Sequence, residues 1–251
     1  MGVVFKNVNV TGGRTRIIQY GVGPSGFSNV ASRNFNGSVI GSFNGLSFLT
    51  PGSAFGVSFW AKMPVSGSAS VVLFQSPLTP NDGFVFFIRA GLGTAIANQL
   101  NFEFIVSIAN IQYRDQIYTS GPSKRDGLWH HYYIGTDGYS YDITTVRLFV
   151  DGVDSTTLIR NEITATQGWA TNGQSQTFGN LSGARSDELA FFDYNPGAAT
   201  CYNAGVPFDL STLATPPTDY FRFENNLTNL GSNGGSAASL SGTPSYSTDV
   251  P

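Results

Sequence analysis

The chain has 251 residues, and its formal net charge of −3 with scattered basic residues argues against nucleic acid as its main partner, because phosphate binding needs a concentrated basic surface. The single cysteine excludes an intramolecular disulfide and a cysteine-rich metal site. A hydrophobic content of 41% supplies a packed core, while 30 glycines and 12 prolines indicate many turns between short elements.

The first ten residues, MGVVFKNVNV, lack the basic start, the long apolar run and the small-residue cleavage site of a secretory signal. No window of the sequence reaches the length of a membrane span. We therefore expect synthesis in the cytosol, without a secretory route and without insertion into a membrane.

The apolar residues alternate or form short continuous runs, which predicts an all-β chain with little helix. Continuous runs at 57–61, 71–74 and 84–88 predict inner strands that are covered on both faces. The segment 100–108 alternates strictly, so one face of this strand should enter the core and the other should face water.

The second half of the chain continues this pattern. VRLFV at 146–150, followed by Asp151–Gly152, predicts a hairpin, because the glycine supplies the positive φ that a tight turn needs. We expect further strands at 186–193 and 220–223, with a single helical turn at 209–213 between them. From residue 231 on, large apolar side chains and charges are almost absent, which is typical of a surface-running tail or a linker.

Several of these segments together resemble the successive strands of a laminin-G-like, concanavalin A-like jelly roll. The segments are FGVSFWAKMP (55–64), GLWHHYYIGTDG (127–138), VRLFVDG (146–152) and SDELAFFDYNPG (186–197). The resemblance implies a two-sheet antiparallel jelly-roll sandwich. It also divides the chain into an N-terminal extension or assembly segment (1–34), the jelly roll (35–200), and a C-terminal part (201–251) whose strand and Gly/Ser-rich tail pack on the sandwich or lead away from it.

The C-terminal part carries a second resemblance. CYNAGVPFDLSTL (201–213) followed by TDYFRFENNLTNLGSNGG (218–235) is similar to the tail that follows such domains in structural proteins of tailed bacteriophages. This resemblance implies release on a virion, and it would explain how a lectin-like fold reaches the outside without a signal peptide.

Both histidines of the chain are adjacent, at positions 130 and 131. Adjacent residues of a strand point to opposite faces, so His130 and His131 should not reach one metal ion without a bulge. We expect both to be structural, and the resemblance implies the same, because its Trp-His pair belongs to the framework of the sandwich.

The sequence offers no assembled catalytic centre. Glucanases on this type of sandwich carry Glu, Asp and Glu at alternate positions of one strand, so that the carboxylates share a face. No Glu-X-Asp-X-Glu occurs here, adjacent Asp187 and Glu188 should diverge, and no Gly-X-Ser-X-Gly elbow is present. We therefore predict that the chain is not an enzyme and requires no cofactor.

Calcium is the candidate ion, because it takes oxygen ligands from carboxylates and loop carbonyls. Asp187 and Glu188, at the start of a predicted strand, are the candidate ligands. The alternative is that this pair of carboxylates binds an arginine or caps a turn.

Glycan recognition needs an aromatic face to stack on a sugar ring, with amides and hydroxyls beside it. The polar segment 164–176 offers Trp169 with amide groups nearby, and two tyrosines follow the Asp137–Gly138 turn. The candidate glycan-binding residues are Trp169, Gln167, Asn172, Gln174, Tyr139 and Tyr141. The alternative is that Trp169 packs under its own loop or in a subunit contact.

These features favour a non-catalytic structural protein of a bacteriophage virion surface, such as a capsid decoration or fibre-type module. Its partners would be other virion proteins or further copies of itself, and it could also bind host surface glycan. The alternative is a carbohydrate-binding adhesin module on an extracellular surface, and a weaker one is a glycoside hydrolase.

Overall fold

The computed structural model describes most of the strands and the C-terminal part of the chain. The described residues are 27–36, 41–43, 53–65, 71–75, 82–90, 100–108, 111–119, 124, 126–138, 145–165, 176–180, 182–232, 239–240 and 243–251. Side chains are described at 27–34, 53–65, 124, 126–138, 145–156, 184–232 and 243–251.

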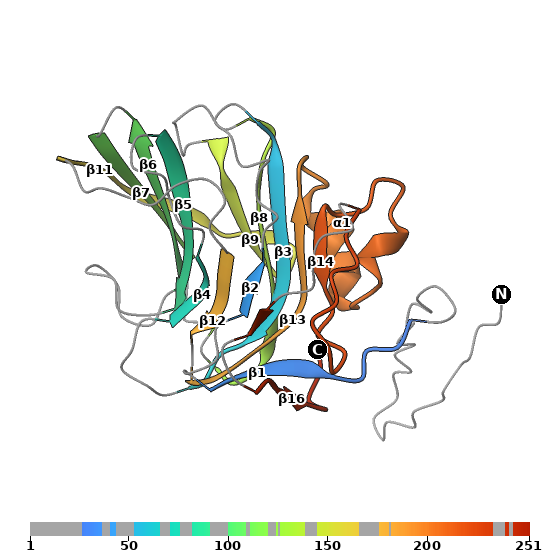
Figure 1. Ribbon diagram of the computed structural model, residues 1–251. Coiled ribbons are helices and arrows are strands. Elements are labelled where there is room, and N and C mark those ends of the chain that lie inside the picture. Colours follow the sequence, from blue (N-terminus) through green and yellow to red (C-terminus); the bar gives the residue numbers. More distant parts are fainter. Residues whose placement is uncertain are drawn as a thin grey trace, which may run out of the picture.

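The described residues form two eight-stranded antiparallel sheets that face each other (Figure 1). Sheet A has the order β10-β9-β8-β3-β13-β1-β16, and β14 pairs with β13 beside this path. Its strands are β10 (Val153–Asp154), β9 (Arg147–Val150), β8 (Trp129–Thr136), β3 (Phe55–Lys62), β13 (Ser182–Phe192), β1 (Ser32–Asn36), β16 (Ser245–Ser247) and β14 (Asp219–Phe221).

Sheet B has the order β11-β7-β6-β5-β4-β12-β2-β15. Its strands are β11 (Thr156–Ala165), β7 (Ile111–Thr119), β6 (Leu100–Ile108), β5 (Asp82–Ala90), β4 (Val71–Gln75), β12 (Gln176–Asn180), β2 (Gly41–Phe43) and β15 (Ser239–Leu240). The two sheets confirm the predicted all-β sandwich.

The face of sheet A that turns toward sheet B, its inner face, is fully buried. Val57 and Phe59 of β3 lie opposite Ile134 and Tyr132 of β8, and all four side chains are at most 1% exposed. The rings of Phe59 and Tyr132 stack with their centroids 5.3 Å apart. Burial of this apolar row is the main source of stability in this part of the sandwich.

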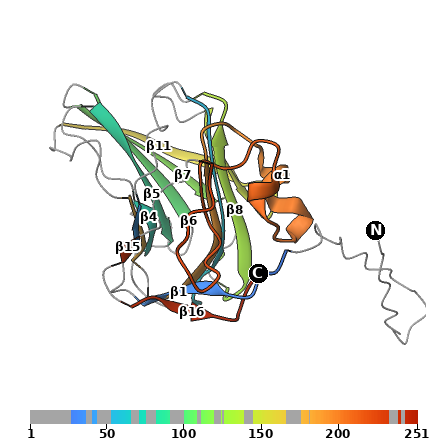
Figure 2. The ribbon, with the colours of Figure 1, turned by 45° about the vertical axis from the view of Figure 1, so that its right-hand side comes forward.

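The opposite, outer face of sheet A is covered by the chain that follows β13. This cover consists of α1 (Ala198–Tyr202) and the 3₁₀ turns η2 (Asn203–Gly205) and η3 (Leu210–Thr212) (Figures 1 and 2). Tyr133, Ala190 and Tyr220 of the sheet form one buried cluster with Cys201 and Leu210 of the cover. Because β3 and β8 are covered on both faces, they read as nearly continuous apolar runs.

The helical turn predicted at 209–213 is confirmed as η3. The Asp209 carboxylate accepts a hydrogen bond from the backbone N–H of Ser211 at 3.0 Å and caps the turn. The short helix α1 and the C-terminal strand β16 were not predicted. None of the described helices is long and apolar enough to cross a membrane.

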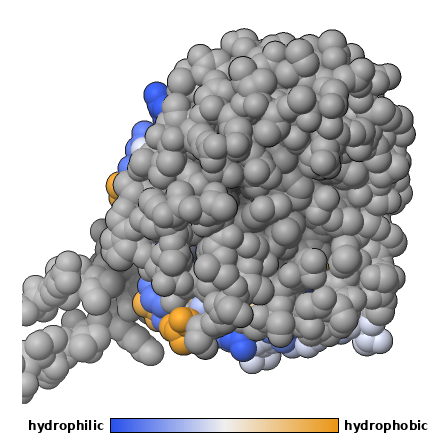
Figure 3. Space-filling model, turned by 90° about the vertical axis from the view of Figure 1, so that its left-hand side faces the viewer, coloured by the Kyte–Doolittle hydropathy of each residue, from blue (hydrophilic) through white to orange (hydrophobic). Residues whose placement is uncertain are grey.

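The predicted domain boundaries stay predictions, although two strands bear on them. β1 begins at Ser32, within the predicted N-terminal extension, and pairs with both β13 and β16. The tail beyond residue 231 contributes β16 to sheet A. Where described residues reach the surface in Figure 3, apolar atoms lie beside hydrophilic ones.

A matched pair of valines tests the burial of the inner face. Val57 is 0% exposed, and Val153 on the edge strand β10 is 65% exposed. We expect Val57→Ala to lower the free energy of unfolding by about 2 kcal/mol, because it removes two buried methyl groups and leaves a cavity. Val153→Ala should change it by less than about 0.5 kcal/mol. Urea unfolding of both variants measures the difference, and equal losses would contradict the assigned packing.

Candidate functional site

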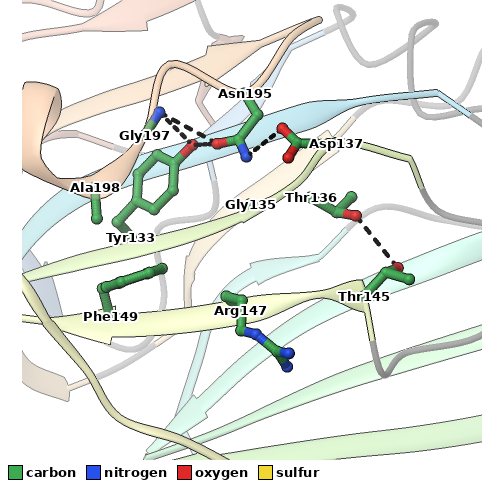
Figure 4. A pocket seen from close by; sticks show the side chains of 10 residues that line it. All are labelled: Tyr133, Gly135, Thr136, Asp137, Thr145, Arg147, Phe149, Asn195, Gly197 and Ala198. Atoms are coloured by element: carbon green, nitrogen blue, oxygen red, sulfur yellow. Dashed lines mark hydrogen bonds between the residues drawn. The ribbon is translucent and has the colours of Figure 1, made fainter.

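A pocket of about 270 Å³ opens at one end of sheet A, where the ends of β8 and β13 meet the start of β9 (Figure 4). Strands β8 and β13 both run antiparallel to β3, so their C-terminal ends lie at the same end of the sheet, one on each side of the start of β3. The pocket is lined by Tyr133, Gly135, Thr136, Asp137, Thr145, Arg147, Phe149, Asn195, Gly197 and Ala198.

The floor of the pocket is aromatic. Tyr133 and Phe149 are direct partners across β8 and β9, and their rings meet edge to face with centroids 6.1 Å apart. Tyr133 is buried, while Phe149 is half-buried, so part of the Phe149 ring remains accessible to a ligand. An apolar ring at the base of a polar pocket suits the apolar face of a sugar.

The side of the pocket formed by the turn after β13 is held by hydrogen bonds of Asn195. Its Oδ1 accepts hydrogen bonds from the Tyr133 hydroxyl and from the backbone N–H of Gly197, and its Nδ2 donates to Asp137 Oδ1 at 2.8 Å. Burial raises the pKa of Tyr133 well above its usual range, so the phenol keeps its proton and remains a donor. These bonds fix the turn against the end of β8 (Figure 4).

Gly135 allows this close approach. A Cβ atom at this position would lie 2.6 Å from the Tyr133 hydroxyl and 2.8 Å from Asn195 Oδ1. Such distances are too short for non-bonded atoms, so a side chain at position 135 would separate the turn from the sheet.

The rim of the pocket carries polar and charged side chains. Asp137, Thr145 and Arg147 are exposed, and the Thr136 hydroxyl lies 3.3 Å from that of Thr145. Arg147 lies opposite Gly135 in the sheet, which places its side chain on the outer face with Phe149. The pocket therefore combines a cation, a carboxylate and hydroxyls above an aromatic ring.

The sequence did not identify this pocket, although it contained a usable signal. Asp137–Gly138 was predicted as a turn, and Asn195–Gly197 ends one of the segments that carry the laminin-G-like resemblance. That the two segments lie close together follows only from the strand order, which places the C-terminal ends of β8 and β13 at the same end of sheet A. The predicted glycan-binding residues Trp169, Gln167, Asn172, Gln174, Tyr139 and Tyr141 lie outside the described residues, and their role stays a prediction.

The two histidines lie on opposite faces of β8, as predicted, and each has a structural partner. His130 Nδ1 lies 2.7 Å from Asp151 Oδ2, and its Nε2 lies 3.0 Å from Asp126 Oδ2. His131 Nε2 lies 2.9 Å from the Ser58 hydroxyl, beneath the Tyr202 ring. Among the described residues no group of three or more His, Cys, Asp or Glu side chains is arranged to hold a metal ion.

The distance between the Ser58 hydroxyl and the His131 imidazole is that of a catalytic serine and its histidine base, but their surroundings are not those of an active site. Both side chains are at most 1% exposed, so no substrate reaches them. Burial also lowers the pKa of His131 to about 3, which keeps the imidazole neutral. The pair therefore satisfies polar groups inside the outer-face cluster.

The regular alternation from which Asp187 and Glu188 were predicted to diverge is interrupted at this point of β13. A β-bulge between Asp187 and Ala190 interrupts β13, and Glu188 takes a positive φ of 50° there. Both carboxyl groups are buried, and burial raises the pKa of each. The charge of Glu188 raises the pKa of Asp187 further.

Glu188 follows the alternative interpretation, in which the acidic pair binds an arginine. Its carboxylate accepts hydrogen bonds from the Tyr220 hydroxyl and from Arg222 Nε, the latter at 3.4 Å. A calcium ion at this carboxylate would lie next to the Arg222 cation, so these contacts do not favour it. Calcium at Asp187 and Glu188 stays a prediction.

Comparisons with known proteins give a family and a fold. A family model described as the concanavalin A-like lectin/glucanases superfamily matches residues 36–201. No match is found among curated proteins.

A similar solved structure is a candidate carbohydrate-binding protein from Bacteroides ovatus, with a TM-score of 0.55 and 11% sequence identity, covering 88% of this chain and 60% of that protein. A pentraxin from Limulus polyphemus has a TM-score of 0.40 and 12% identity, with 68% and 80% of the two chains covered. Domains LG4-5 of the mouse laminin α1 chain have a TM-score of 0.40 and 12% identity, with 67% and 43% covered.

The contacts of His130 predict a pH-dependent contribution to stability. The hydrogen bond to Asp151 raises the pKa of His130 above its ordinary value, the bond to Asp126 raises it too, and burial opposes both. A raised histidine pKa stabilises the fold fully below about pH 6.5, and this contribution is lost as the pH rises through the folded-state pKa. We expect the difference in unfolding free energy between the unaltered chain and His130→Gln to shrink as the pH rises above about 6.5.

A direct NMR titration of the His130 imidazole provides the control for this prediction. Its pKa should lie above the ordinary value in the unaltered chain and fall in Asp151→Asn. A pKa below the ordinary value in the folded chain would contradict the assigned contacts.

The burial of Asp187 predicts the effect of removing its charge. A raised carboxyl pKa means that the folded chain holds a proton that the unfolded chain releases above about pH 4, so stability falls as the pH rises toward the folded-state pKa. Asp187→Asn should therefore raise the free energy of unfolding at pH 8, as measured by urea unfolding.

The same measurement with millimolar calcium tests the ion. Calcium held by this pair would stabilise the unaltered chain and not the Asp187→Asn variant. A calcium effect of that kind would show that the Glu188–Arg222 pair opens to admit the ion.

Proposed function

Because this chain belongs to the concanavalin A-like lectin/glucanases superfamily, we propose that it is a carbohydrate-binding module whose ligand occupies the pocket between β8, β9 and the turn after β13. The observation that carries the proposal is the combination of the accessible Phe149 ring with the exposed Arg147 and Asp137 side chains in one pocket. The Bacteroides ovatus protein, named as a candidate carbohydrate-binding protein, supports the same class of function.

A sugar ring presents an apolar C–H face and a set of polar hydroxyl groups, and different side chains of the pocket would bind each of them. The Phe149 ring would cover an apolar C–H face, and the rim side chains would exchange hydrogen bonds with hydroxyl groups. Since Asn195 and Tyr133 are already hydrogen-bonded to each other, the turn is preorganised and little ordering would be needed on binding. A volume of about 270 Å³ suits one sugar unit rather than a long segment of polysaccharide.

The proposed activity is binding without hydrolysis. Glycoside hydrolysis ordinarily takes two carboxyl groups, one on each side of the scissile bond. Asp137 is the one carboxyl group among the described residues that line the pocket. The superfamily includes glucanases, so turnover of a polysaccharide would overturn this part of the proposal.

The virion function is a proposal that rests on the resemblance of residues 201–235 to bacteriophage structural proteins. Location on a virion surface, and contact with other virion proteins, depend on that resemblance alone. Co-purification of the chain with intact particles would support it, and absence of the chain from washed particles would contradict it.

A glycan array followed by titration tests the carbohydrate-binding proposal. We expect Arg147→Ala and Phe149→Ala each to weaken binding of the best glycan by about tenfold or more, because each removes a direct contact worth about 1–3 kcal/mol. Asp193→Ala, at an exposed position outside the pocket lining, is the control and should bind as the unaltered chain does.

A third variant distinguishes this pocket from the site predicted at Trp169. If Trp169→Ala abolishes glycan binding while Arg147→Ala and Phe149→Ala have no effect, the sugar binds the polar segment 164–176 and the pocket assignment is wrong. A folded chain that binds no glycan on the array would contradict the proposed function as a whole.

A further inference from the structure

Three hydrogen-bond donors lie side by side across the outer face of sheet A, far along the strands from the pocket. Lys62 of β3 is the register partner of both Trp129 on β8 and Arg185 on β13. Directly paired residues point to the same face, so the ammonium, indole and guanidinium groups form one row. We call Trp129, Lys62 and Arg185 the carboxylate cradle.

The cradle holds a carboxylate, which the C-terminal tail of the chain supplies. Lys62 Nζ and Trp129 Nε1 donate hydrogen bonds to Asp249 at 2.8 and 2.9 Å, and Arg185 Nη1 donates to the same oxygen as Lys62. The ammonium, indole and guanidinium groups carry N–H donors and no acceptor atoms. A ligand that binds all three must therefore offer two acceptor atoms, as the two oxygens of a carboxylate do. Asn34 Oδ1 accepts from Arg185 Nε at 2.9 Å and orients the guanidinium.

The occupant of the cradle lies at the surface, where it can be exchanged. The side chains of Lys62, Arg185 and Asp249 are 29%, 32% and 35% exposed. Ion pairs with this degree of exposure are weak, so the Asp249 carboxylate is held by several weak contacts. The strand that leads to Asp249, β16, has three residues and is the last strand of sheet A on this side.

The surroundings of the cradle match the rest of an acidic sugar. The half-buried Trp129 indole offers an aromatic surface, and Asn34 and Ser245 bring an amide and a hydroxyl beside the row. We propose that the cradle is a second carbohydrate-binding site, which takes the carboxylate of a uronic acid, and that Asp249 occupies it when no such sugar is bound. This inference rests on the proposed function, because it assigns the class of ligand to a carbohydrate-binding chain.

Asp249→Asn tests the proposal with the full chain. The amide keeps the size of the side chain but turns a donor toward the donors of the cradle, so the tail should leave. The probe is an oligosaccharide of galacturonic acid, compared with the same oligosaccharide after reduction of its carboxyl groups to alcohols. We expect Asp249→Asn to bind the acidic oligosaccharide about tenfold more tightly than the unaltered chain, since a competing carboxylate is removed.

The controls assign this gain to the cradle. Asp193→Asn should show no gain, the reduced oligosaccharide should gain nothing, and the addition of Lys62→Gln to Asp249→Asn should remove the gain. No gain in Asp249→Asn, a gain shared by the reduced oligosaccharide, or a gain that survives Lys62→Gln would each overturn the proposal. A synthetic peptide of residues 243–251 that binds Asp249→Asn when the acidic oligosaccharide does not would show that the cradle only anchors the tail.

A measurement on the unaltered chain covers the case in which Asp249→Asn does not fold. The NMR signal of the Trp129 indole N–H should shift on addition of the acidic oligosaccharide and not of its reduced form, and the absence of a shift at saturating sugar would overturn the proposal. Arg147→Ala separates this site from the pocket. It should leave the shift of Trp129 unchanged even where it abolishes binding of a neutral glycan.

Discussion

The coverage of β3, β8 and β13 on both faces is the constraint on which the rest of the structure depends. Sheet B covers the inner face, and α1 and η3 cover the outer one. Tyr133 shows what this arrangement achieves, because its ring belongs to the outer-face cluster while its hydroxyl fixes the turn that borders the pocket. Without the cover, the outer cluster would be exposed and the pocket would lose one wall.

The same cover requires polar groups to be paired within the fold. His131 is paired with Ser58, and Glu188 with Tyr220 and Arg222. Each pair is buried or nearly so, where an unpaired polar group would cost about 1–3 kcal/mol. In the sequence these residues resemble catalytic groups, but in the fold they are largely buried and contact one another. The side chains to which we assign ligand binding lie in the pocket at one end of sheet A and along the row occupied by Asp249.

Much of the fold could be predicted from the sequence, because alternation and continuous apolar runs report directly on burial. The run at 57–61 predicted that β3 is covered on both faces, and a helical turn was predicted at 209–213, where η3 lies. The bulge at Glu188 could not be predicted in this way, because strict alternation assumes a regular strand. Strand β16 was missed because the tail has few apolar side chains, and because both its pairing with β1 and the polar contacts of Asp249 join residues that are distant in sequence. For the same reason the pocket was missed: its lining comes from two turns that only the strand order brings together.

We expect a neutral sugar to bind in the pocket between β8, β9 and the turn after β13. An NMR titration with a glycan identified by array locates the bound sugar directly, through the backbone amide signals that shift. We expect the amide signals of Gly135, Arg147 and Gly197, which line the pocket, to shift in proportion to saturation, while that of Tyr246 on β16, at the opposite edge of sheet A, does not shift. Saturable binding that leaves these pocket signals unmoved would contradict this assignment.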